Sequence, residues 1–222
     1  MDLEAIQTPA RADILALVPI ATVKAEQRFN SMSEDWLIGD FICQAYGWFD
    51  GPHGWFRRAI LPQRWTYYRR DFPRAAIAPM YPYPFLDAAA KPFQIPMPPL
   101  TSVDEIAYRD ETGAWQVVDP SVYEVLTRAD DFGAVTLALG QEWPTLIPRE
   151  RAVRVKFTAG YEEGKVPDPI LRCIRFLAGY FFMNRNVTFE DTRVTTIDRK
   201  IVYGIEAIGG RFRFPNDLVE SF

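Results

Sequence analysis

Few side chains in this sequence have the types and spacing that catalysis requires. His53 is the only histidine, and it lies in the turn sequence DGPHGW. A lone histidine in a turn is far more often solvated than a catalytic base. The sequence contains no G-x-S-x-G elbow, no G-x-x-x-x-G-K-[ST] loop and no G-x-G-x-x-G loop, the usual motifs for a nucleophile or a bound phosphate. We therefore expect no catalytic residue and no enzymatic activity.

The sequence predicts no metal ion and no cofactor. The acidic pairs at 130–131 and 162–163 lie beside turn glycines, where charges are normally solvated, although carboxylates distant in sequence can still meet in a fold. Cys43 and Cys173 each lie among apolar residues in a helical pattern, which predicts buried free thiols in a reducing compartment. One histidine and two cysteines are too few for a metal site.

Composition places the chain among globular proteins. Its 222 residues are 48% hydrophobic and 24% charged, enough to bury a sizeable core in one large domain or two small ones. The 25 Lys and Arg against 29 Asp and Glu give a net charge of −4, and no basic stretch is long enough to favour tight nucleic-acid binding. The start has no basic leader, and no apolar run approaches the ~18 residues of a membrane span. Neither secretion nor membrane insertion is expected.

Two helices are predicted in the first quarter of the chain. Residues 20–29 have a helical pattern after Pro19, and a second helix is predicted between a capping box at Ser31 and Glu34 and a stop at Gly51. Apolar residues cover most of the second helix, so we expect it to be buried on more than one side.

Alternating patterns after Pro62 predict about six short strands. One strand carries Val153, Val155 and Phe157 on a single face, and two others join at a turn over residues 110–113. A further helix is predicted to begin at Pro169, with Asp168 as its N-cap.

This order of elements predicts an α+β fold. A helical bundle of N-terminal helices and one C-terminal helix (residues 19–61 and 167–187) is interrupted by an inserted antiparallel β-rich part (residues 62–166). An extended C-terminal tail (residues 188–222) completes the chain. The prolines concentrated in residues 79–99 predict an extended arm, which either packs on its own subunit or lies on a neighbouring one.

The order of the motifs resembles one family. In sequence they are TVKAEQRF, DWLIGDFICQAYGWFD, LPQRWTYYRRDFP, PPLTSVDEIAYRDETGAWQVVDPSVYEV, Trp143-Pro144, AVRVKFTAGY and VPDPILRCIRFLAGYFFMNR. Together, over residues 19–187, they resemble the head–tail connector or adaptor proteins of long-tailed bacteriophages and of gene transfer agents derived from them. The Pro-rich arm is longer here than in that family, and the residues after Asn186 resemble the family only in position and apolar character.

The resemblance implies a structural protein of the virion neck. Adaptors of this kind form a homo-oligomeric ring, commonly of twelve copies, beneath the portal protein. The next neck, stopper or tail protein attaches to the other face, double-stranded DNA passes through the lumen, and no membrane is involved. Assembly is expected in the host cytoplasm. By position, the resemblance assigns portal docking to the tail near Tyr203, Phe212 and Phe214.

The helix at 167–187 carries more apolar surface than one facing layer covers. Either it is a central core helix of a monomer, or part of it meets a neighbouring subunit. The residues expected to pack between subunits are Ile174, Leu177, Phe181 and Phe182.

Two other functions remain open at this point. A stopper or tail-proximal neck protein would share the same aromatic, Pro-rich and ring-forming character. A cellular β-rich ligand-binding or hydrolytic module would instead hold a pocket lined by some of the 6 Trp and 10 Tyr residues.

Overall fold

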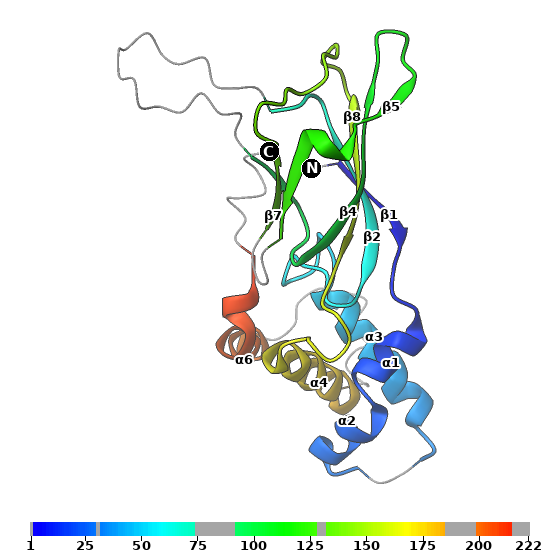
Figure 1. Cartoon of the computed structure of the whole chain (residues 1–222). Coiled ribbons are helices and arrows are strands. Elements are labelled where there is room, and N and C mark those ends of the chain that lie inside the picture. Colours follow the sequence, from blue (N-terminus) through cyan, green and yellow to red (C-terminus); the bar gives the residue numbers. More distant parts are fainter. Residues whose placement is uncertain (1, 30–31, 74–91, 128–131, 185–198, 215–222) are drawn as a thin grey trace, which may run out of the picture. The chain divides into compact units, whose positions relative to one another are not determined.

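A computed structural model describes residues 2–29, 32–73, 92–127, 132–184 and 199–214 (Figure 1). The chain divides into two compact units. Among the described residues, a β unit contains those within 2–8 and 63–160, and a helical unit contains those within 9–62 and 161–214. The fold class is α+β, as the sequence predicts. The first residues belong to the β unit, which the sequence interpretation did not include.

Two antiparallel sheets make up the β unit. The larger has the order β1-β2-β8-β4-β5 and the smaller the order β3-β7-β6. The strands of the larger sheet are β1 (Asp2–Gln7), β2 (Gln63–Arg69), β8 (Val153–Ala159), β4 (Leu100–Arg109) and β5 (Trp115–Val117). Those of the smaller sheet are β3 (Phe93–Ile95), β7 (Gly133–Leu137) and β6 (Tyr123–Leu126), with a short 3-10 turn, η1 (Pro120–Val122), before β6.

Alternation along β8 places its apolar side chains in the core of the β unit, as predicted. Val153, Val155 and Phe157 are fully buried, whereas the residues between them are part-exposed, because successive strand residues point to opposite faces. The two sheets touch where Gly133 of β7 meets Leu100 of β4. A Cβ on this glycine would lie 2.0 Å from the Leu100 side chain, so only glycine permits this approach.

The predicted turn between β4 and β5 is also confirmed. Asp110 accepts hydrogen bonds from the backbone N–H groups of Thr112 and Ala114 and from the hydroxyl of Thr112. Gly113 closes the turn with a φ of 90°, a left-handed conformation that glycine adopts without strain. The short side chain of Asp110 therefore replaces the bonds that the backbone loses at the turn.

The helical unit contains α1 (Arg11–Leu17), α2 (Ile20–Gln27), α3 (Asp35–Phe49), α4 (Asp168–Met183) and α6 (Arg199–Gly209), which η2 (Gly210–Phe212) extends. Neighbouring helices pack in the order α6-α4-α3-α1, and α2 contacts both α3 and α4 (Figure 1). The core lies among these helices and draws only on residues of the helical unit.

Two helix starts differ from expectation, and one helix was not predicted. The second helix begins at Asp35 with Glu34 as its N-cap, and Ser31 of the predicted capping box lies outside the described residues. The helix near 168 begins one residue early, with Asp168 inside it and Pro167 as its N-cap. α1 was not predicted.

The expected extended tail is wrong at Arg199–Gly209, which form α6. Ile201, Ile205 and Ile208 recur at helical spacing and pack on the core of the helical unit. Gly204 and Gly209 obscure this pattern in the sequence, because glycine normally disfavours a helix interior. Contact with α4 stabilises the helix despite these glycines.

Both cysteines are free thiols, as predicted. Cys173 is buried and Cys43 is half-buried. Burial raises the pKa of the Cys173 thiol to about 12, and its sulfur lies 3.7 Å from the carbonyl oxygen of Ile205. The thiol therefore stays protonated at neutral pH, and Cys173 serves to pack α4 against α6.

Candidate interaction surfaces

The described residues offer little for catalysis. They contain no group of three or more His, Cys, Asp or Glu side chains that could hold a metal ion. His53 is exposed in the loop after α3. Among the same residues, no helix combines the length and apolar character needed to cross a membrane. Each unit also presents exposed surfaces that could contact another protein.

The four residues expected to pack between subunits lie in the core of the helical unit. Ile174 and Leu177 are fully buried, and Phe181 and Phe182 are buried to more than nine-tenths. The Phe181 ring lies 6.2 Å from that of Phe41. These side chains pack within their own chain, so the surface that α4 offers to a partner is carried by other residues.

The exposed surface of α4 carries Arg172, Phe176 and Met183. Phe176 lies near Gly204 of α6, because a Cβ there would be 3.4 Å from the phenyl ring. Tyr203, next to that glycine, is 66% exposed. This part of the helical unit therefore combines aromatic rings with the guanidinium of Arg172, which forms no ion pair with another described residue.

Only one of the three expected tail contacts is exposed. Phe212 and Phe214 are buried, and the backbone N–H of Phe214 donates to the carbonyl oxygen of Phe56 at 3.0 Å. Tyr203 is the one of the three that remains available to a partner. The structure thus separates residues that shape the unit from the residue that can touch another protein.

The segments WFRR (55–58) and RFRF (211–214) lie side by side in the helical unit and carry several arginines. The guanidinium of Arg213 lies 5.0 Å from the centre of the Trp55 ring, and that of Arg211 lies 4.6 Å from the Phe212 ring. Aromatic faces attract guanidinium groups and hold them in place. We call Arg57, Arg211 and Arg213 the arginine surface. In the described part of the chain, none of the three forms an ion pair.

A fourth arginine lies beneath this surface. Arg58 is 2% exposed, and its guanidinium donates to the Tyr161 hydroxyl and lies near the rings of Tyr161 and Phe212. Its Nε has no hydrogen-bond partner among the described residues. The buried charge adds to the positive potential of the arginine surface, because the surrounding protein screens it less than water would.

An apolar groove of about 580 Å³ lies beside α1 in the same unit. Leu17, Leu61, Val166 and Leu171 supply its apolar lining, and Asp13 and Glu163 add two carboxylates. The Asp13 carboxylate accepts the backbone N–H of Ala10 at 3.0 Å. Neither carboxylate forms an ion pair with another described residue. We call this site the acidic groove. Its lining suits a partner that brings both apolar and cationic groups.

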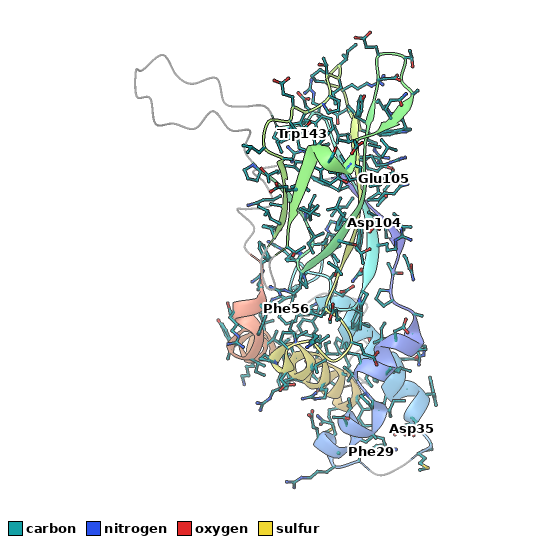
Figure 2. All side chains as sticks on the ribbon, in the orientation of Figure 1. Phe29, Asp35, Phe56, Asp104, Glu105 and Trp143 are labelled. Atoms are coloured by element: carbon teal, nitrogen blue, oxygen red, sulfur yellow. The ribbon has the colours of Figure 1, made fainter. Side chains whose placement is uncertain are left out.

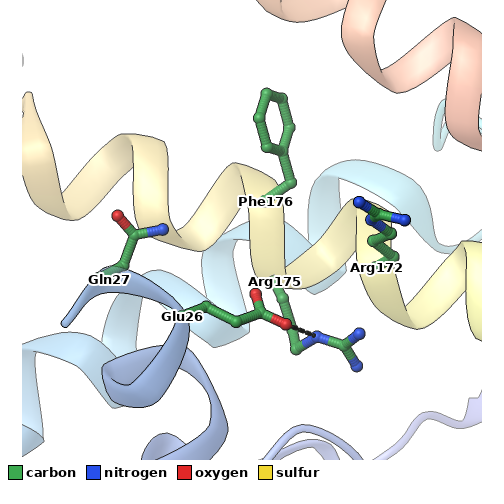
Figure 3. A pocket seen from close by; sticks show the side chains of 5 residues that line it. All are labelled: Glu26, Gln27, Arg172, Arg175 and Phe176. Atoms are coloured by element: carbon green, nitrogen blue, oxygen red, sulfur yellow. Dashed lines mark hydrogen bonds and ion pairs between the residues drawn. The ribbon is translucent and has the colours of Figure 1, made fainter.

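A second hollow, of about 430 Å³, lies between α2 and α4 (Figure 3). Glu26, Gln27, Arg172, Arg175 and Phe176 line it. The Nε of Arg175 donates to the Glu26 carboxylate at 2.8 Å. This pair neutralises one of the two arginine charges in the hollow. Among the charged side chains that line this hollow, only the Arg172 guanidinium has no ionic partner in the described part of the chain, so the hollow carries little net charge to attract a partner.

Charges on the exposed face of the larger sheet are largely paired with one another. Glu105, whose side chain is labelled in Figure 2, binds Arg154 at 2.7 Å and Lys156 at 3.2 Å, and Arg151 binds the carboxylates of Asp2 and Glu4. Desolvation raises the pKa of Glu105, but hydrogen bonds and charges from Arg154 and Lys156 outweigh it and hold the pKa below its ordinary value. Compensated charges of this kind give a solvated face with little net attraction for a partner.

Several aromatic rings of the β unit contact one another. Trp143 stacks on Phe72 with ring centres 4.6 Å apart, and the Tyr123 ring lies 6.5 Å from Trp143. Neither of the two hollows has a Trp or Tyr side chain in its lining.

Aromatic–arginine repeats at 55–58 and 211–214 were visible in the sequence but were not used to predict a surface. Cation–π pairing between two such segments is the feature that would have linked them. The acidic groove had no comparable pattern, because its two carboxylates are 150 positions apart.

The chain has the fold of proteins found in the necks of gene transfer agent (GTA) particles. A chain from the neck of an empty GTA particle, computed with C6 symmetry, matches with a TM-score of 0.66 and 16% identity over 97% of both chains. Chains from the virion of a native GTA particle and from a native neck computed with C12 symmetry match over the same share of both chains, with TM-scores of 0.65 and 0.64 and identities of 15% and 14%. No protein-family model and no curated protein matches the sequence. The resemblance that the motif order indicated is thus confirmed at the level of the fold.

Proposed function

We propose that this chain is a structural protein of the neck of a phage-like or gene-transfer-agent-like particle. The observation that carries this proposal is the fold shared with neck and virion chains over 97% of both partners. Coverage of both units makes a shared module on an unrelated protein a poor explanation. The role is structural and not enzymatic, and the place of action is the virion.

The more specific proposal is a head–tail adaptor that forms a ring beneath the portal. The motif order over residues 19–187 supports this position, and a ring of twelve copies is compatible with both the C6 and the C12 symmetry of the matching particles. In this role the chain binds the portal on one face and the next neck, stopper or tail protein on the other. Double-stranded DNA passes through the lumen as transient cargo.

Portal docking is proposed for the exposed part of the C-terminal region. Of the three expected contacts, Tyr203 is the accessible one, whereas Phe212 and Phe214 are buried within the helical unit. In this proposal the C-terminal region contacts the portal, and Tyr203 provides the aromatic contact.

Deletion of the gene in the cells that produce the particle tests the neck role. We expect capsids and tails to accumulate as separate objects in negative-stain electron microscopy, because the piece that joins them is missing. Expression of the intact chain from a plasmid is the control and should restore tailed particles. Tailed particles of normal yield in the deletion strain would contradict a neck function.

A binding experiment separates an adaptor from a stopper. Tagged chain is mixed with tail-less capsids isolated from the deletion strain, and the capsids are recovered by centrifugation. An adaptor should bind these capsids directly through their portal. A stopper or tail-proximal neck protein should bind only after another neck protein is present.

A further inference from the structure

We propose that copies of this chain associate head to tail, with the arginine surface of one copy bound in the acidic groove of the next. This inference rests on the proposed ring in the neck and names the two surfaces that would close it. Both surfaces belong to the helical unit, so the contact requires no particular placement of the β unit.

The two surfaces are made by different residues of the same unit. The arginine surface is carried by Arg57 in the loop after α3 and by Arg211 and Arg213 in and after η2, whereas the acidic groove lies beside α1 and is also lined by residues 61–62, 163–164, 166 and 171. Packing in the order α6-α4-α3-α1 puts α6 and α1 at opposite ends of a row (Figure 1). Two different surfaces of one copy make a head-to-tail contact, and such contacts close into rings when the rotation between copies permits it.

The two surfaces are complementary in charge. Arg57, Arg211 and Arg213 form no ion pair in the described part of their own chain, and neither do Asp13 and Glu163. Guanidinium and carboxylate groups form strong, oriented hydrogen bonds with each other. Each surface therefore offers the group that the other lacks.

They are also complementary in apolar character. Trp55 and Phe212 lie behind two of the arginines, and the groove has leucine and valine side chains between its carboxylates. Arginine with aromatic neighbours is the composition typical of well-bound interface cores. A guanidinium that enters the groove can pair with a carboxylate while its stem covers the apolar lining.

Nucleic acid is the rival occupant of the arginine surface. Phosphates would pair with the same guanidinium groups, but they would be repelled by the acidic groove and would leave its apolar lining uncovered. A second copy satisfies both surfaces with one contact, and for this reason we favour it.

A charge exchange between the two surfaces tests the proposal on the full chain. Sedimentation velocity over about 1 to 500 µM should show concentration-dependent association of the wild type, which weakens as salt screens the charges. Arg213→Glu and Glu163→Arg should each lower the association constant by about tenfold or more. The double variant, which reverses the pair, should recover to within about threefold of the wild type.

Two matched variants control for charge alone. Glu162→Arg changes the exposed neighbour of Glu163 that does not line the groove, and Arg172→Glu changes an arginine on α4 that forms no ion pair with any described residue. Both should keep the association constant within about twofold of the wild type. Circular dichroism of every variant checks that the helical unit is folded.

Three outcomes would overturn the proposal: a wild type that stays monomeric at the highest concentration, no recovery in the double variant, or equal losses in the control variants. A fourth is Arg213→Glu weakening the binding of a 30-base-pair DNA duplex while self-association stays unchanged, which would assign the arginine surface to nucleic acid. The neck role does not depend on any of these results, because the gene deletion tests it separately.

Discussion

Charged residues are used differently in the two units. In the β unit, Arg154, Lys156 and Glu105 satisfy one another across neighbouring strands. In the helical unit, Arg57, Arg211 and Arg213 remain without ion pairs in the described structure. Paired surface charges contribute modestly to stability, whereas unpaired arginines beside aromatic rings remain available to a partner. The residue scale thus points to the helical unit as the part that binds other molecules through charge.

Asp110 provides a test of local stability in the β unit. Hydrogen bonds from the Thr112 hydroxyl, the Gln116 amide and backbone N–H groups lower its pKa to about 2. A lowered folded-state pKa stabilises the fold above the ordinary carboxyl pKa and loses that contribution as pH falls toward 2. We expect Asp110→Asn to lower the thermal midpoint at pH 7 and to differ less from the wild type at pH 3.

Glu111→Gln is the matched control for this experiment, since Glu111 is the exposed neighbour in the same turn. It should leave the midpoint nearly unchanged at both values of pH. A difference between Asp110→Asn and the wild type that stays constant from pH 7 to 3 would show that the hydrogen bonds do not depend on the ionised carboxylate.

At the scale of elements, α4 is the central helix of its unit. It contacts α2, α3 and α6, which explains why apolar side chains cover so much of its circumference. Ile170, Ile174 and Leu177 are fully buried, while Arg172 and Met183 are exposed. The unusual apolar content of this helix reflects three neighbours within the chain, so a partner is needed only for the remaining exposed strip.

Truncation along α4 should separate its buried and exposed sides. We expect Leu177→Ala to reduce the free energy of unfolding by about 2–5 kcal/mol, because it leaves a cavity among three helices. Met183→Ala, at a position that is 67% exposed, should change it by less than about 0.5 kcal/mol. Urea unfolding followed by circular dichroism measures both. Equal losses in the two variants would contradict the burial that the structure assigns to Leu177.

At the scale of the whole molecule, most of the β unit is an insertion into the helical unit. The chain leaves the helical unit after Pro62 and returns at Tyr161. The backbone N–H of Tyr161 donates to the carbonyl oxygen of Ile60 at 3.3 Å, so the points of departure and return are adjacent. The proposed contacts between copies need only the helical unit.

Removal of the insertion tests this organisation. We expect a chain that begins at Pro9 and carries a short Gly-Ser linker in place of residues 63–160 to remain helical and to unfold cooperatively. The physical reason is that the core of the helical unit uses only its own residues, and a short linker spans adjacent chain ends at little entropic cost. Circular dichroism and thermal unfolding provide the readout. An unfolded product would show that the helical unit requires the β unit.

The sequence pattern predicted the elements in which hydrophobic periodicity within the element itself indicates a strand or a helix. β8 was predictable because Val153, Val155 and Phe157 alternate with polar residues, and α3 because apolar residues fill a capped segment. β1 was not predicted, since most of its residues are exposed and its pairing with β2 and its ion pairs with Arg151 come from distant parts of the chain. α6 was missed because contact with α4 outweighs the low helix propensity of its glycines.

The sequence by itself determined the α+β class, the main strands and helices and the resemblance to neck adaptors, because hydrophobic period and motif order are local properties of the chain. Only the tertiary structure decided which apolar residues are buried inside the chain and which stay exposed to a partner. Phe181 and Tyr203 are both aromatic residues on helices, yet the first is buried and the second is exposed. Likewise, Trp55 meets Arg213, and Asp13 and Glu163 line one groove, only when distant segments pack together. Such surfaces depend on long-range contacts, which no local pattern encodes.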